Sequence, residues 1–212
     1  YIMRRKGPLS LGVNQLGGLV RATPDAPRLD TQLYINPITY SVTDGDTRRL
    51  TKPDRAPGFA LSFNSCRPYS AGSVYIKSAD AATPPAIHGN YLDDQRDIDD
   101  VLRMARFIGR MQNSPSVQKL LAAPPETNLL ALSDNEIIDD FRTRSGTVFH
   151  PCGTCRMGPD RRHSVVDPQL RVHGVGKLRV ADAAIFPNIT SANTNAPTIA
   201  VAHKAASLIL QH

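Results

Sequence analysis

Apolar and polar residues alternate in three short runs of the first half of the chain. The runs cover residues 31–36, 59–64 and 73–77. Such an alternation places successive side chains on opposite faces of a strand, so that one face is buried and the other is wetter. Turn-forming residues separate the runs at positions 44–46, 52–54 and 67–72. The pattern therefore predicts an antiparallel sheet.

A helical pattern follows from residue 94 to residue 111. Acidic residues crowd its first turns and arginines come later, an arrangement that suits the helix dipole. Apolar side chains fall on one stripe of this helix, at Ile98, Val101, Leu102, Ala105 and Ile108. A second helix is expected after the capping-box sequence SDNE at residues 133–136. Its buried side would be formed by Ile137, Ile138 and Phe141.

The last quarter of the chain changes character. Residues 149–158 form a loop rich in glycine, cysteine and small polar residues, and residues 177–182 predict a short strand that ends at Asp182. Residues 196–210 predict an amphipathic helix with Asn195 or Asn193 as its N-cap. Its tightly packed side would comprise Ile199, Ala202, Ala205, Ala206 and Ile209.

Composition excludes several classes of protein. The 212 residues carry a formal net charge of +6, but the basic residues are scattered and their densest clusters, at 4–6 and 161–163, contain no aromatic residue. A nucleic-acid partner is therefore not expected. No apolar run reaches about eighteen residues, so no membrane span is expected either. Three cysteines in a chain of this length do not fit a secreted disulfide scaffold.

The cysteine pair in Cys152-Gly153-Thr154-Cys155 allows three interpretations. It could be a thioredoxin-like redox pair, although the sequence GPD at 158–160 would stop the helix which that motif needs. It could bind zinc together with His150, His163 or His173, although a structural zinc site normally shows two paired sets of ligands. Small buried hydrophobic cysteines are the favoured interpretation, and no metal site is predicted.

Taken one at a time, the other features of this region have structural explanations. A histidine in a glycine-rich loop, an aspartate that ends a strand and an asparagine before a helix are commonly structural residues. Their order along the chain is more specific. It comprises HPCGTCRMG at 150–158, VVDP at 165–168, RVHGV at 171–175, LRVADA at 178–183, IFP at 185–187 and NTNAPT at 193–198.

This series resembles the C-terminal signature of the glucose–methanol–choline (GMC) oxidoreductase family. Residues 7–92 are more loosely similar to the family's substrate domain, from GPL at 7–9 to PYSAGSV at 68–74. The resemblance implies an α+β fold with an antiparallel substrate-binding domain over residues 1–147 and helices on one face of its sheet. Residues 148–212 would complete a Rossmann-type FAD-binding domain with its C-terminal strand and helix.

The resemblance also implies an activity and a set of site residues. Family members oxidise an alcohol CH–OH group and pass a hydride to FAD. His150 corresponds to the family's catalytic histidine, and the second active-site position falls on Asn195. Contacts to the cofactor would come from Asp182, Ala183, Asn193, Thr194, Pro197 and Thr198.

These residue types suit the chemistry. A histidine near neutral pKa can take the hydroxyl proton, and an amide can hydrogen-bond the same oxygen without competing for the proton. A helix that starts near Ala196 would stabilise negative charge on the reduced flavin through its N-terminal amides. A flavin-containing hydroxynitrile lyase and a non-catalytic substrate-binding fragment are alternative functions.

One departure from the family is large. No Gly-x-Gly-x-x-Gly fingerprint occurs in the sequence, so the chain is not expected to hold the ADP part of FAD in the usual way. The expected partners are a small alcohol and a missing N-terminal FAD-binding portion. The N-terminus, YIMRRKGP, reads as the middle of a larger protein and not as a signal peptide. A cytoplasmic location is the resulting expectation.

Overall fold

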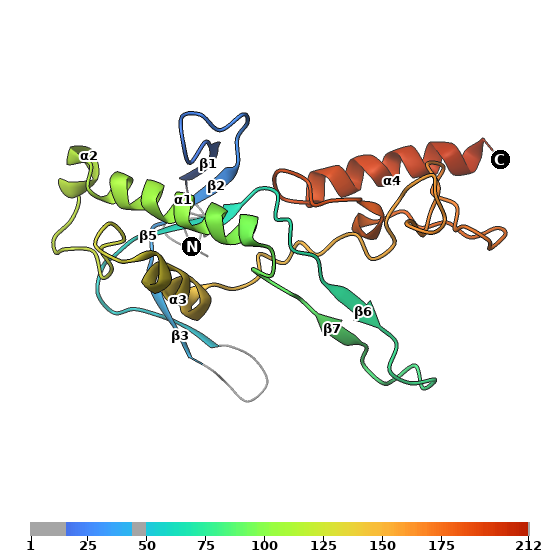
Figure 1. Ribbon diagram of the computed structural model, residues 1–212, viewed down its shortest axis with the longest axis horizontal. Coiled ribbons are helices and arrows are strands. Elements are labelled where there is room, and N and C mark those ends of the chain that lie inside the picture. The colour runs from blue at the N-terminus through green and yellow to red at the C-terminus, as the bar shows by residue number, and fades with distance from the viewer. Residues whose placement is uncertain (1–15, 44–49, 212) are drawn as a thin grey trace, which may run out of the picture. The chain divides into compact units, whose positions relative to one another are not determined.

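The computed structural model describes residues 16–43 and 50–211 (Figure 1). The predicted turn at 44–46 and the similarity at 7–9 lie outside the described residues. The strands are β1 (Leu16–Val20), β2 (Thr31–Asn36), β3 (Tyr40–Thr43), β4 (Leu50–Pro53), β5 (Ala60–Ser65), β6 (Ser73–Tyr75) and β7 (Ala86–His88). The α-helices are α1 (Gln95–Gln112), α2 (Pro115–Gln118), α3 (Asp134–Arg144) and α4 (Asn195–Leu210).

The chain divides into two compact units. The first comprises Tyr1–Ser65 and Ile98–Ser145, and the second comprises Cys66–Asp97 and Gly146–His212. The expected division into substrate and cofactor parts at residues 147 and 148 stays a prediction, because compactness alone does not assign a function to either unit.

The first unit is built on an antiparallel sheet. Its order is β1-β2-β5, and β3 pairs with β4 in a separate two-stranded ribbon. Leu33 of β2 lies opposite Gly18 on one side and Phe63 on the other. The predicted strand at 31–36 is confirmed, and the one predicted at 59–64 is shifted by one residue. Strand β1 was not predicted, because the sequence LGGLV lacks alternation.

Helix α1 crosses this sheet and supplies its core. Asp100 accepts a hydrogen bond of 3.3 Å from the Ser65 hydroxyl at the end of β5, and Arg110 donates one of 3.1 Å to the carbonyl of Ala22 after β1. The side chains of α1 that are at most 3% exposed are Val101, Met104, Ala105 and Ile108. The predicted stripe is therefore correct except that Met104 is more deeply buried than Leu102.

The predicted capping box of α3 is confirmed. The Ser133 hydroxyl accepts a hydrogen bond of 3.4 Å from the backbone N–H of Glu136, whose carboxylate accepts one of 2.7 Å from the Ser133 N–H. Ile137 and Ile138 are buried, and the ring of Phe141 stacks on Phe63 with 5.8 Å between the centroids. The cap and the apolar face together fix α3 within the unit.

The second unit consists mostly of turns and loops around a small core. Strands β6 and β7 form an antiparallel hairpin, and the strand predicted at 73–77 ends two residues earlier, at Tyr75. The buried cluster of this unit comprises Val166, Leu170, Ile185, Phe186 and Ala205.

The predicted strand at 177–182 is not formed. Arg179 makes only an isolated bridge to Arg171, and Lys177 has a positive φ of 63°. The Val180 N–H bonds the Leu170 carbonyl at 3.1 Å, and the Val172 N–H bonds the Leu178 carbonyl at 3.0 Å. The backbone of this segment therefore pairs with a nearby turn instead of a neighbouring strand. The α+β class with antiparallel sheets is nevertheless confirmed.

Helix α4 starts at Asn195, and two details of its prediction are wrong. Its N-cap is Thr194 and neither asparagine. Of the side predicted to be tightly packed only Ala205 is buried, whereas Ile199 is 62% exposed. The inward side is formed instead by Val201, Ala205 and Leu208, which pack against the core cluster at helical spacing.

None of the helices in the described part of the chain has the length and apolar character needed to span a bilayer.

Candidate active site

His150 lies between two neighbouring side chains from the start of α4. Its Nε2 is 2.7 Å from the amide nitrogen of Asn193, and its Nδ1 is 3.0 Å from the hydroxyl oxygen of Thr194. Thr194 is buried, with 7% of its surface exposed, whereas His150 is half-buried and Asn193 is exposed. Two motifs more than forty residues apart in the sequence therefore meet at one imidazole ring.

The two contacts select one tautomer of the ring. An amide nitrogen can only donate a hydrogen bond, so the Nε2 atom that faces Asn193 must be the acceptor. A neutral imidazole then carries its proton on Nδ1 and donates it to the Thr194 hydroxyl oxygen. The geometry leaves Nε2 as the basic atom of His150, and Thr194 as the residue that orients the ring.

Backbone hydrogen bonds hold the loop that follows His150. The N–H groups of Gly153, Cys155 and Met157 donate to the carbonyls of residues 183, 184 and 185, at 3.4, 2.9 and 2.8 Å. Gly153 has a φ of +85°, which a residue with a side chain rarely adopts. This glycine turns the chain from the histidine into the paired segment.

Asp182 begins that paired segment. Its Oδ1 accepts a hydrogen bond of 2.7 Å from the N–H of Ala184 and caps the short 3-10 helix Ala183–Ile185. The side chain is exposed, while Ala183 is half-buried. The capping role of Asp182 is thus established, and the predicted contacts of Asp182 and Ala183 with the cofactor stay a prediction.

The first turn of α4 carries the other predicted site residues. The Thr194 side chain does not cap the helix, and the Thr194 carbonyl accepts hydrogen bonds from the N–H and the hydroxyl of Thr198 at 3.0 and 2.7 Å. Pro197 and Thr198 are half-buried, and Asn195 is exposed. Within the described residues, Asn195 makes no hydrogen bond to His150; the structure brings Asn193 to the ring.

Both cysteines of the pair, Cys152 and Cys155, are half-buried, so the favoured interpretation of small buried cysteines is met only in part. Cys152 packs against the core cluster of the second unit, and burial raises the pKa of its thiol. No disulfide joins the three cysteines, and the described residues contain no group of three potential metal ligands. A raised pKa disfavours the reactive thiolate that a redox pair needs.

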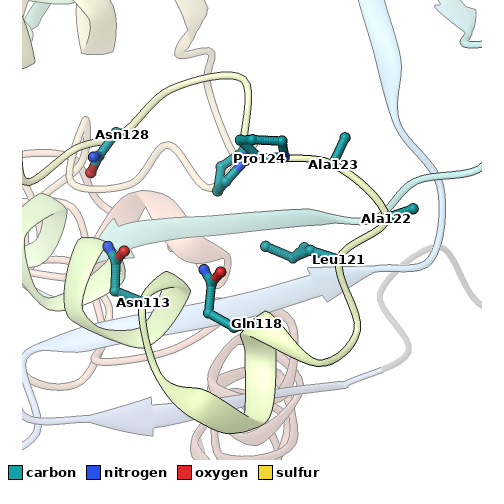
Figure 2. Close-up of a pocket in the computed structure, with 8 residues that line it drawn as sticks. Asn113, Gln118, Leu121, Ala122, Ala123, Pro124 and Asn128 are labelled. Atoms are coloured by element: carbon teal, nitrogen blue, oxygen red, sulfur yellow. The ribbon is translucent and has the colours of Figure 1, made fainter.

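A separate pocket of about 430 Å³ lies in the first unit (Figure 2). Its lining comprises Asn113, Gln118, Leu121, Ala122, Ala123, Pro124, Pro125 and Asn128. The amide of Asn113 donates to the carbonyl of Gly109, and the amide of Gln118 donates to that of Gln112. These amides stabilise turns, and the lining contains no acid, base or nucleophile.

Comparison with known proteins decides the family. The family model described as GMC oxidoreductase matches residues 68–202. The chain belongs to the GMC oxidoreductase family. The match includes every predicted site residue, from His150 to Thr198.

Individual GMC relatives agree with this assignment. An alcohol dehydrogenase [acceptor] of Pseudomonas putida is 38% identical over 213 residues, which is all of this chain and 37% of that protein. The mitochondrial choline dehydrogenase of Mus musculus is 31% identical over 93% of this chain and 32% of its own length. The chain thus spans less than two fifths of each of these relatives.

Solved GMC structures share the fold. A formate oxidase is 26% identical, with a TM-score of 0.81 over 99% of this chain and 40% of that chain. Pyridoxine 4-oxidase from Mesorbium loti is also 26% identical, with a TM-score of 0.74 over 94% of this chain and 38% of its own. A third similar structure is a variant of the formate oxidase of Aspergillus oryzae, solved to examine how the mutation affects modification of FAD. It is 26% identical, with a TM-score of 0.77 over 99% of this chain and 40% of that chain.

Sequence reasoning missed two features of the GMC site. The motif Asn193-Thr194-Asn195 offers the same amide twice, and the sequence contains no signal that decides which one meets the histidine. Thr194 was predicted only as a cofactor contact, whereas its hydroxyl contacts Nδ1 of His150. A threonine directly before a helix is expected to cap it, so nothing in the sequence indicated this use.

Proposed function

We propose that this chain is part of an FAD-dependent oxidoreductase that oxidises the CH–OH group of an alcohol. The observation that carries the proposal is the His150 ring, which Asn193 and Thr194 hold in one tautomer with its basic atom at Nε2. Membership of the GMC family and a relative named alcohol dehydrogenase support the same activity.

His150 would accept the proton of the substrate hydroxyl at Nε2. The Asn193 amide occupies the donor position at this atom, and an alcohol hydroxyl would replace it there. The displaced amide could then donate to the alcohol oxygen, which holds that oxygen for reaction. The Nδ1 proton stays on the Thr194 side, so the ring needs no rotation when it becomes charged.

The start of α4 fits the flavin of FAD. Because the Thr194 side chain does not cap the helix, the N–H groups of Asn195 and Ala196 in the first turn are not satisfied by it. A helix of 16 residues adds positive dipole character at this end. Bound FAD would supply the hydride acceptor, and the negative charge that develops on its ring would be stabilised by these amides.

The remaining cofactor contacts are proposed from the same region. Asp182 and Ala183 would lie along the ribityl–pyrophosphate part, and Asn193, Thr194, Pro197 and Thr198 would lie near the flavin ring. Residues 148–212 would complete a Rossmann-type domain. The ADP part would be bound by the portion of the protein that the longer relatives carry beyond the match.

The proposal is tested by mixing the full-length protein anaerobically with benzyl alcohol, 1-butanol or choline. Alcohol oxidation predicts that the visible absorbance of oxidised flavin is lost with at least one of the three. Mandelonitrile serves as the contrasting probe, because a hydroxynitrile lyase would release cyanide from it without bleaching the flavin. If the flavin is not bleached and no cyanide is released, the protein binds without catalysis. That outcome would contradict the proposal.

A further inference from the structure

Arg67 reaches a segment more than a hundred residues further along the chain. One of its guanidinium nitrogens donates a hydrogen bond to the hydroxyl of Ser191, and both residues belong to the second unit. Ser191 lies in the loop between the buried Phe186 and Thr194, two residues before Asn193. The contact therefore connects the segment after β5 to the loop that carries the amide partner of His150.

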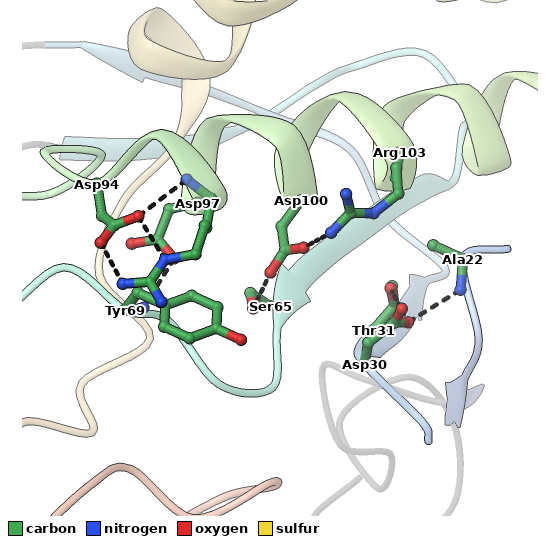
Figure 3. Close-up of polar contacts among 10 residues, drawn as sticks. Ala22, Asp30, Thr31, Ser65, Tyr69, Asp94, Asp97, Asp100 and Arg103 are labelled. Atoms are coloured by element: carbon green, nitrogen blue, oxygen red, sulfur yellow. Dashed lines mark hydrogen bonds and ion pairs between the residues drawn. The ribbon is translucent and has the colours of Figure 1, made fainter. Parts of the chain in front are cut away.

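The segment that carries Arg67 is firmly anchored, and Figure 3 shows Tyr69, Asp94 and Asp97, which take part in the contacts that follow it. Cys66, directly before it, is 3% exposed. Two residues further on, the N–H groups of Tyr69 and Ser70 donate to the two oxygens of the Asp97 carboxylate at 2.8 and 2.7 Å. Asp97 is itself 4% exposed. Arg67 therefore projects from backbone that is fixed on both sides.

A second set of contacts reinforces this anchor. The guanidinium of Arg96 lies 3.8 Å above the ring of Tyr69 and pairs with Asp94 at 2.6 Å. The backbone N–H of Asp94 donates to the Ser70 hydroxyl at 3.0 Å. The start of α1 and residues 69–70 thus hold each other in place, which gives the Arg67 side chain a stable base.

The loop that receives Arg67 needs such support. Residues 187–193 contain no helix or strand, and Asn193 at their end is exposed. Within this stretch the Thr190 hydroxyl donates a local hydrogen bond of 3.2 Å to the Ala192 carbonyl. A hydrogen bond to Ser191 from an anchored arginine restricts where the following residues can lie. Asn193 is the first site residue after it.

We propose that Arg67 is a positioning residue for the reaction, acting through Ser191 to keep the Asn193 amide beside His150, where it can donate to the oxygen of an alcohol bound at Nε2. The inference rests on the proposed alcohol oxidation. A planar guanidinium fixes direction as well as distance, so its loss lets the loop shift. A displacement of about 1 Å at a reacting group can cost about 10²-fold in rate, so even a partial shift of Asn193 should be measurable.

The test uses four variants of the full-length protein with benzyl alcohol as the probe: R67Q, R67K, S191A and the double variant R67Q/S191A. Arg67→Gln should lower kcat by about 10-fold, with KM and FAD content unchanged, because orientation is lost and binding is not. Ser191→Ala should lower kcat in the same direction. The double variant should be no slower than Arg67→Gln alone, because both changes break one contact. Arg67→Lys should recover part of the rate.

Arg162→Gln is the matched control, because Arg162 is an exposed arginine of the same unit that pairs with Asp160 at 3.2 Å. It should leave kcat unchanged. Additive losses in the double variant, or a loss of FAD that accounts for the whole rate effect, would overturn the positioning role. If Arg67→Gln fails to fold, Ser191→Ala alone decides through its kcat.

Hydrogen–deuterium exchange separates this inference from the proposed function. Peptides that cover residues 186–195 should exchange faster in Arg67→Gln and in Ser191→Ala than in the wild type. In the double variant they should exchange no faster than in Arg67→Gln alone. This readout needs no alcohol. A wild-type protein that oxidises no alcohol would defeat the proposed function, whereas unchanged exchange in these peptides would defeat the positioning role by itself.

Discussion

Helices α3 and α4 begin with the same kind of residue but use it differently. At the start of α3, in the first unit, the Ser133 hydroxyl accepts a hydrogen bond from the helix itself. At the start of α4, in the second unit, the Thr194 side chain makes no capping hydrogen bond and its hydroxyl lies 3.0 Å from Nδ1 of His150. One hydroxyl stabilises a helix, and the other orients a ring.

The difference extends to the surroundings of each cap. In the first unit the capped helix α3 packs its apolar face, which includes Ile137 and Phe141, into the core. In the second unit the Thr194 side chain leaves the first amides of α4 uncapped, and the proposed flavin site would use them. Proteins commonly give up local stability where function needs an unsatisfied group. We therefore expect stability to depend mainly on the first unit and chemistry mainly on the second.

The largest expected effect is on stability, from Met104→Ala in the first unit. Met104 is 2% exposed in the middle of α1. Its truncation should lower the free energy of unfolding by about 3 kcal/mol, through lost burial and the cavity left behind. Urea unfolding measures this loss, and kcat per bound flavin should not change.

Leu120→Ala is the control for this variant, because Leu120 is 73% exposed. Its unfolding midpoint should match that of the wild type. A reduced kcat per bound flavin in Met104→Ala would break the separation between a stabilising unit and a chemical one.

His150→Gln should have the largest effect on turnover. Loss of a general base commonly lowers rates by about 10²-fold, equivalent to about 2.7 kcal/mol. Steady-state kinetics with benzyl alcohol would measure the loss, and FAD content should stay the same because His150 is not among the predicted cofactor contacts. His163→Gln, at an exposed histidine of the same unit, should behave as the wild type. Full turnover in His150→Gln would reassign the ring to a structural role.

Two asparagines separate the structure-based pairing from the sequence-based one. Asn193→Ala should lower kcat by about 10-fold, since its amide lies beside Nε2 of His150 and would donate to the alcohol oxygen bound there. Asn195→Ala should stay close to the wild type, because this side chain is exposed and alanine is well accommodated in a helix. The kcat ratio of the two variants is the measurement. A larger loss in Asn195→Ala would favour the pairing predicted from the sequence.

Periodicity predicted the first unit well because burial there follows from regular elements. The stripe on α1, the cap at Ser133 and the strand at 31–36 each satisfy their hydrogen bonds locally or with a neighbour of similar pattern. Strand β1 escaped detection since two glycines interrupt its apolar residues.

The motifs of the second unit indicated its family, but they did not predict its local structure or its contacts. Residues 177–182 have the composition of a strand, yet their backbone groups bond to the turn at 170–172. Ile199 has the position of a core residue, yet it is 62% exposed. The contacts of His150 with Asn193 and Thr194 join residues more than forty positions apart, and no local propensity encodes such a contact.

The smallest expected effect concerns the two caps, and it depends on pH. Ser133→Ala should cost about 1 kcal/mol of stability at neutral pH. Hydrogen bonds from the Ser133 hydroxyl and then its backbone N–H lower the pKa of Glu136 from its ordinary value of 4.5. A depressed folded-state pKa stabilises the protein above the unfolded pKa, and this stabilisation is lost as the pH falls through the folded value. The difference between Ser133→Ala and the wild type should therefore shrink in acid below about pH 4.5.

Thr194→Val offers the contrast, because the first turn of α4 contains no acidic residue. Any stability it loses should lack this acid-dependent component, and its main effect should be on kcat. Urea unfolding of both variants at neutral and acidic pH measures the difference, and equal acid dependence at the two caps would remove the distinction between them.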